Sequence, residues 1–151
     1  METTIPNFLL AGPSRDLVAS ARQEITRIWW RRDHARFDVF ISQTVLDEAL
    51  CGDHAAAAKR REFLAPFPML NPTREVQRLT ELYIRQHIVP AEKPDDAVHL
   101  AFVVAYRVQF LCTWNFRHLA NALVLHRLRN LNEKQELFTP LMCTPEELLG
   151  E

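Results

Sequence analysis

The chain has 151 residues, of which 48% are hydrophobic and 25% charged, and these values suit one globular domain and argue against wholesale disorder. Its 3 glycines are isolated, so neither a dinucleotide-binding fingerprint nor a phosphate-binding loop is possible, and its 3 cysteines form no CxxC pair. The formal net charge of -1 by itself argues against binding nucleic acid through bulk positive charge. With no visible signal peptide and no apolar run of about 20 residues, we expect a soluble cytoplasmic protein that has no contact with a membrane.

The first half of the chain alternates between helical and strand-like patterns. Apolar residues at three- and four-residue spacing predict a helix over residues 16–33, and a β-branched and aromatic run predicts a buried strand over 37–42. Ser42 is expected to cap a helix that ends near Leu50. An alanine-rich helix is expected over 54–64, followed by a short strand within 66–70.

The second half repeats this alternation. Helices are predicted over 73–87, 95–106 and 119–131, a buried strand over 110–113, and a last short strand over 140–143, before a capped helical turn at 144–147. Strands that alternate with helices form right-handed crossovers. The pattern therefore predicts an α/β fold with a mostly parallel sheet covered by helices on both faces.

Polar side chains gather after the predicted strands, where functional residues of such sheets usually lie. Four segments contribute them: Glu2; Glu48; Asp95, Asp96 and His99; and Asn115, Arg117 and His118. Carboxylate and amide oxygens are hard ligands that suit Mg²⁺ or Mn²⁺. Each residue also has an ordinary structural explanation, since acids favour the first turn of any helix and His99 suits a core position.

Five stretches of the sequence together resemble a known family. They are Glu2–Asn7 (ETTIPN), Ser42–Glu48 (SQTVLDE), Asp95–Ala101 (DDAVHLA), Thr113–Asn121 (TWNFRHLAN) and Thr144–Leu148 (TPEEL). In this order they resemble the PIN domain family, and specifically the branch of the VapC toxins of bacterial toxin-antitoxin pairs. The resemblance implies a single PIN-like domain over residues 1–151 with a three-layer α/β/α fold around a central parallel sheet. We expect its first strand to be truncated, because Glu2 follows Met1 directly.

The resemblance also implies a function, that of a metal-dependent endoribonuclease and the toxin of a toxin-antitoxin pair. The implied catalytic residues are Glu2, Glu48, Asp96 and Asn115, and Mg²⁺ or Mn²⁺ would be bound by Glu2, Glu48, Asp96 and the auxiliary Asp95. Thr113 and His99 would hold the ligands in position, and Arg117 and His118 would contact the RNA phosphate. The implied partners are the RNA substrate, a cognate antitoxin and a second copy in a homodimer.

Other interpretations stay open. Asn115 supplies an oxygen but no charge where the family usually has a fourth acid, and this motivates an alternative function: a catalytically weak or inactive PIN-fold module that binds RNA or protein. Arginine clusters such as Arg31-Arg32 either follow a phosphate backbone or form a solvated face. An enzyme that uses a cysteine is disfavoured, because Cys112 lies within a predicted buried strand, where a thiol is usually inert.

Overall fold

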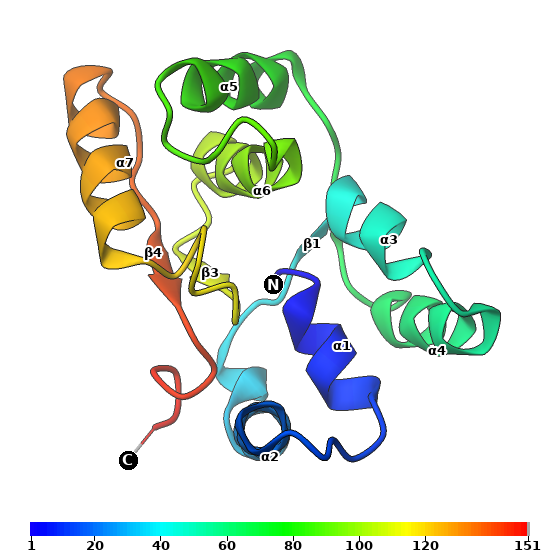
Figure 1. Cartoon of the computed structure of the whole chain (residues 1–151). Coiled ribbons are helices and arrows are strands. Elements are labelled where there is room, and N and C mark those ends of the chain that lie inside the picture. The colour runs from blue at the N-terminus through cyan, green and yellow to red at the C-terminus, as the bar shows by residue number, and fades with distance from the viewer. Residues whose placement is uncertain (151) are drawn as a thin grey trace.

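The computed structural model describes residues 1–150, and over this range the chain is a mixed fold of helices and short parallel strands (Figure 1). The α-helices are α1 (Thr4–Leu10), α2 (Leu17–Arg32), α3 (Gln43–Ala49), α4 (His54–Leu64), α5 (Arg74–Arg85), α6 (Pro94–Ala105) and α7 (Ala122–Lys134). The strands are β1 (Ile41–Ser42), β2 (Met69–Leu70), β3 (Phe110–Cys112) and β4 (Leu141–Cys143), and a 3₁₀ turn, η1 (His34–Arg36), follows α2. None of these helices has both the length and the apolar character needed to cross a bilayer.

The strands of the described residues form two separate parallel pairs, β1 with β2 and β3 with β4. The N-terminus lies between the two pairs, at the centre of the molecule (Figure 1). The Met1 amino group donates a hydrogen bond to the Phe40 carbonyl at 2.8 Å, and the Glu2 N–H donates to the Cys112 carbonyl at 3.0 Å. Successive residues that bond to opposite sides are typical of a middle strand. Met1–Glu2 therefore bridges the two strand pairs through one backbone hydrogen bond to each side.

The sequence pattern predicted most of these helices and strands close to their observed positions. Helices α2 to α7 and strands β2 to β4 fall within or close to their predicted ranges. Ser42 caps α3 as predicted, since its Oγ accepts a hydrogen bond from the Val45 N–H at 3.3 Å. The predicted turn at 144–147 is also confirmed, because the Thr144 and Glu147 side chains each bond the other residue's backbone N–H in a capping box.

Two elements differ from the prediction. The strand expected over 37–42 is reduced to Ile41–Ser42, because among the described residues only these two pair with β2, which is itself two residues long. Helix α1 was not predicted, since it is only 7 residues long and contains a proline. Pro6 lies in its first turn, where the missing N–H costs no helical hydrogen bond.

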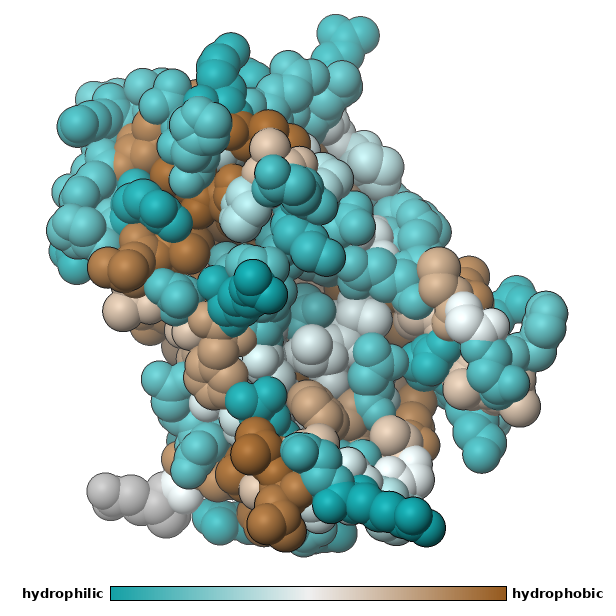
Figure 2. Space-filling model, viewed as in Figure 1, coloured by the Kyte–Doolittle hydropathy of each residue, from teal (hydrophilic) through white to brown (hydrophobic). Residues whose placement is uncertain are grey.

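Three clusters of buried side chains position the elements that matter for the site. The largest joins α5, α6, α7 and β3 around residues such as Leu79, Leu100 and Leu128. A second packs Ile5 of α1 against Trp29 of α2 and Trp114, and a third packs β1, α3 and α4. The clusters fix α1, α3, α6 and β3 around the N-terminal segment. On the surface, hydrophobic atoms gather around α2 (Figure 2), whose first turn exposes Leu17 and Val18.

Candidate metal centre

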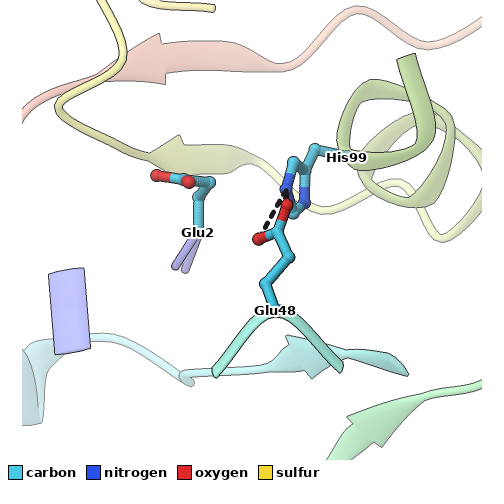
Figure 3. A group of neighbouring side chains, drawn as sticks. All are labelled: Glu2, Glu48 and His99. Carbon is cyan, nitrogen blue, oxygen red and sulfur yellow. Dashed lines mark hydrogen bonds and ion pairs between the residues drawn. The ribbon is translucent and has the colours of Figure 1, made fainter. Parts of the chain in front are cut away.

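Glu2, Glu48 and His99 form the group of side chains best suited to hold a metal ion among the described residues. Glu2 comes from the N-terminal segment, Glu48 from α3 and His99 from α6 (Figure 3). One ligand atom from each lies within 4.8 Å of the other two. Glu2 and His99 are buried and Glu48 is partly exposed, so the group is open to solvent on the Glu48 side.

The Glu2 carboxylate is held in one orientation by hydroxyl and amide donors. Its Oε2 accepts hydrogen bonds from the Thr113 hydroxyl at 2.8 Å, the Thr4 hydroxyl at 2.5 Å and the Thr4 N–H at 3.0 Å. Within residues 1–150, no hydrogen bond is made to Oε1. Donors that engage one oxygen and leave the other free orient a carboxylate for metal binding.

Glu48 and His99 form a partly buried ion pair at the centre of the group. The His99 Nε2 lies 3.3 Å from a Glu48 carboxylate oxygen, and the Thr3 hydroxyl also donates to this carboxylate. Burial alone would lower the pKa of His99, but the hydrogen bond to Glu48 and the nearby carboxylates raise it on balance. Burial alone would raise the pKa of Glu48, but its hydrogen bond to His99 and the His99 charge lower it on balance. The carboxylates therefore favour the protonated form of His99, and a bound cation would compete with that proton.

Asp96 lies beside this group, at the start of α6. Its Oδ1 accepts a hydrogen bond from the Asn115 Nδ2 at 2.8 Å, and its Oδ2 lies 2.9 Å from the His118 Nδ1. Burial raises the pKa of Asp96 above its ordinary value; the His118 and His99 charges oppose this shift, and the Glu2 charge adds to it. Asp96 thus shares its electrostatic surroundings with Glu2 and His99, although its oxygens lie outside the group of three ligand atoms.

Most of the residues that were predicted for the site lie together. Thr113 connects two of them, because its hydroxyl donates to Glu2 and accepts the N–H of Asn115 at 2.9 Å. His99 was expected to support the ligands, and its ring also lies close enough to Glu2 and Glu48 to offer a ligand atom of its own. Asn115 was expected to offer its carbonyl oxygen to the metal, but here that oxygen accepts the His118 N–H at 3.0 Å.

Three of the residues predicted for the site do not contact Glu2, Glu48 or His99. The Asp95 side chain is exposed, and no hydrogen bond or ion pair to it is found within residues 1–150. Arg117 is also exposed, at the surface that follows Asn115. His118, expected to contact the substrate, lies with its Nδ1 at 2.9 Å from the Asp96 Oδ2. Sequence reasoning missed the roles of Thr3 and Thr4, whose only signal was their position directly after Glu2.

The donor set fits a transition ion better than Mg²⁺. It contains two carboxylates and one imidazole, and an imidazole is not the usual ligand of Mg²⁺, which prefers oxygen. Opposite ligands of a six-coordinate ion of this size lie about 4.2 Å apart, from metal–ligand bonds of about 2.1 Å. Donor atoms within 4.8 Å of one another therefore need only small side-chain rotations to bind one ion. Mn²⁺ accepts this mixture of oxygen and nitrogen ligands.

The chain was compared with known protein families, curated proteins and solved structures. No protein-family model, curated protein or solved structure matches this chain. The observations that bear on function are therefore the geometry of the metal centre and the motifs that converge on it.

Proposed function

We propose that the chain is a PIN-like endoribonuclease that uses Mn²⁺ or Mg²⁺ to hydrolyse RNA phosphodiester bonds, as the toxin of a toxin-antitoxin pair. The observation that carries the proposal is the convergence of Glu2, Glu48 and His99, with Asp96 beside them, from three separate segments. The two parallel strand pairs joined by Met1–Glu2 are compatible with the three-layer fold that this function implies. A cognate antitoxin and a second copy of the chain belong to the same proposal.

In this proposal, the residues of the metal centre have separate roles in metal binding and proton transfer. A bound divalent ion would lower the pKa of a coordinated water and polarise the scissile phosphate. Glu2, fixed by Thr4 and Thr113, would offer its free Oε1 as a ligand, and Glu48 and His99 would supply the other two ligand atoms. Asp96 holds the His118 ring, and an imidazole beside a buried carboxylate is able to deliver a proton to the leaving oxygen.

The surface beside the centre suits single-stranded nucleic acid. Phe116 follows Asn115 directly and is 43% exposed, and the Arg22 guanidinium lies 5.0 Å from the centre of its ring. An exposed aromatic ring next to a cation binds single strands by stacking a base and contacting a phosphate. Arg117, exposed on the same segment, adds a second cation. These contacts favour RNA over a small-molecule phosphate ester as the substrate.

The test is cleavage of an end-labelled single-stranded RNA by the purified chain in Mn²⁺ and in EDTA. Glu48→Gln and Asp96→Asn should each lower the cleavage rate by at least a hundredfold, and Glu92→Gln, an exposed neighbour, is the matched control. Asp95→Asn separates the exposed Asp95 from the buried Asp96: it should leave the rate within about twofold. Cleavage that persists in EDTA, or that Asp96→Asn leaves unchanged, would refute the proposal.

A second function is favoured by one observation. Asn115 uses both ends of its amide, on Asp96 and on the His118 N–H, so it adds neither a charge nor a ligand to the metal centre. A catalytically inactive module that binds RNA would have such a centre. Calorimetric titration distinguishes the two functions, because RNA binding without Mn²⁺ binding supports the module.

A further inference from the structure

The strand pair β3–β4 places two of the three cysteines opposite each other. In the register of this pair Cys112 is the direct partner of Cys143, and Leu111 is the direct partner of Met142. Leu111 and Met142 both belong to the largest buried cluster. Because side chains alternate along a strand, both cysteines point to the other face of the pair, where Cys112 packs in the cluster of Trp29. The two thiols therefore share one buried face.

The spacing of the two strands allows a disulfide bond at this position, with some strain. Neighbouring strands lie about 4.8 Å apart, and the Cα atoms of a disulfide lie about 4.4–6.8 Å apart. The Cβ atoms of a relaxed disulfide are closer, at about 3.8 Å. The Cys143 Sγ leans toward β3, since it lies 4.0 Å from the Leu111 carbonyl oxygen. A bond between the two sulfurs thus requires the strands to approach each other by about 1 Å.

The turn that follows β4, residues 144–150, controls access to the two thiols. Burial raises the pKa of both thiols, that of Cys143 to about 12, and neutral thiols react slowly. Leu148 and Leu149 pack on the cluster that contains Cys112, and Arg32 donates a hydrogen bond to the Gly150 carbonyl at 3.1 Å. A short segment held by a few contacts opens more easily than a core strand. Opening of this turn therefore limits how fast an oxidant reaches the thiols.

A bond between the cysteines would act on Glu2 through β3. The Cys112 carbonyl accepts the Glu2 N–H at 3.0 Å, and the hydroxyl of the next residue, Thr113, donates to the Glu2 carboxylate at 2.8 Å. On its other side β3 faces β4, where the Thr113 N–H bonds the Cys143 carbonyl at 2.9 Å. Because β3 lies between Glu2 and β4, movement of Cys112 toward β4 lengthens both of its contacts with Glu2.

We propose that Cys112 and Cys143 are a redox-responsive pair: a peroxide joins them in a disulfide, and this bond weakens the metal centre by drawing β3 away from Glu2. The sulfur of one cysteine breaks the O–O bond of hydrogen peroxide and becomes a sulfenic acid, and one water leaves with the thiol proton. The second sulfur then displaces the hydroxyl, which takes the second thiol proton and leaves as water. One S–S bond forms, the two cysteines are oxidised, and the peroxide is reduced to two waters.

The strain makes this disulfide reversible, because a strained disulfide is readily reduced by thiol–disulfide exchange with a dithiol, which is itself oxidised to a disulfide. Formation of the bond does not depend on RNA cleavage or on metal binding. Its effect on metal affinity rests on the metal centre of the proposed function.

The test treats the folded, reduced chain with hydrogen peroxide in EDTA, alkylates the remaining thiols and identifies disulfides by peptide mass spectrometry. The chain carries Cys51→Ser, because Cys51 is exposed and would form bonds between molecules. We expect one cross-linked peptide pair, Cys112 with Cys143, that has lost two hydrogen atoms and that dithiothreitol separates again. The proposal is wrong if both cysteines stay free at a peroxide dose that oxidises all Cys51 of the parent chain, or if they reach sulfinic acid without a cross-link.

Two further measurements separate the bond from its effect. Oxidation should speed amide exchange at Glu2 and lower Mn²⁺ affinity by about 10–100-fold, the loss that is typical when a group that orients a ligand is removed. Addition of Cys143→Ala gives the matched control, in which peroxide should change neither; if circular dichroism shows it unfolded, reversal by dithiothreitol in the same sample replaces it. Equal exchange and equal Mn²⁺ affinity before and after oxidation would overturn the proposal. A cross-link with faster exchange at Glu2, in a reduced chain that binds no Mn²⁺, would refute the proposed function and leave the redox pair in place.

Discussion

Replacement of Thr113 by valine tests how the Glu2 carboxylate is held. Thr113 is completely buried, and its hydroxyl makes two hydrogen bonds, one to the charged Glu2 carboxylate and one from the Asn115 N–H. A hydrogen bond to a charged group contributes about 1.5–3 kcal/mol and one between neutral groups about 0.5–1.5 kcal/mol. Valine keeps the shape and loses both, so Thr113→Val should lower the free energy of unfolding by about 2–4.5 kcal/mol.

The assay is urea denaturation in EDTA, followed by Mn²⁺ titration of the folded protein. Thr113→Ser keeps the hydroxyl and should recover most of the stability, while Thr80→Val removes a threonine hydroxyl that bonds the Val76 carbonyl, far from the site. Loss of a group that orients a ligand typically costs 10–100-fold in metal affinity, and only Thr113→Val should show this loss. If Thr113→Val matches Thr113→Ser in both measurements, the hydroxyl does not hold Glu2.

Three other changes test the rest of the site. Asn115→Asp brings a second carboxylate against Asp96, so it should lower the melting temperature in EDTA and widen the gain on adding Mn²⁺; an unchanged melting temperature in EDTA would contradict this. His99→Gln removes the pair with Glu48: because the Glu48 pKa lies below 4.5 and the His99 pKa above 6.5, the loss of stability in EDTA should be largest between pH 4.5 and 6.5 and should shrink as the pH rises through the His99 value. Phe116→Ala should weaken RNA binding about tenfold, from about 1–3 kcal/mol per stacked base, without changing Mn²⁺ affinity, and equal RNA affinity would exclude stacking there.

The fold could be predicted wherever local chemistry decides it. Helices α2 to α7 have apolar stripes, and most begin at a capping residue such as Asp16, Ser42 or Asn121, so their positions follow from the sequence. The length of β1 could not be predicted, because a strand extends only as far as its partner does and β2 has only two residues, Met69–Leu70. Pairing between distant segments depends on the whole fold and leaves no mark in a local window.

The site could be predicted only in part, because contacts between segments that are distant in the sequence decide which residues lie close enough to bind a metal. Glu2, Glu48 and Asp96 belong to recognisable motifs, but the choice between ligand and supporting residue depends on distances of a few ångströms. His99 joins the ligand atoms because α6 packs next to α3, which brings its ring to Glu48. Asp95 and Asp96 are neighbours in sequence, yet successive residues of a helix point in different directions, and only Asp96 turns inward.

The position of Glu2 at the middle of the fold also fixes when the site can form during synthesis. Its hydrogen bond to Thr113 joins residues 111 positions apart. At about 5–20 residues per second, the ribosome needs roughly 6–22 s after Glu2 to reach Thr113. Until then the carboxylate has no β3 to bind, so a nascent chain carries α1 and α2 but no metal centre. Any activity of that centre therefore begins only after most of the chain has left the ribosome.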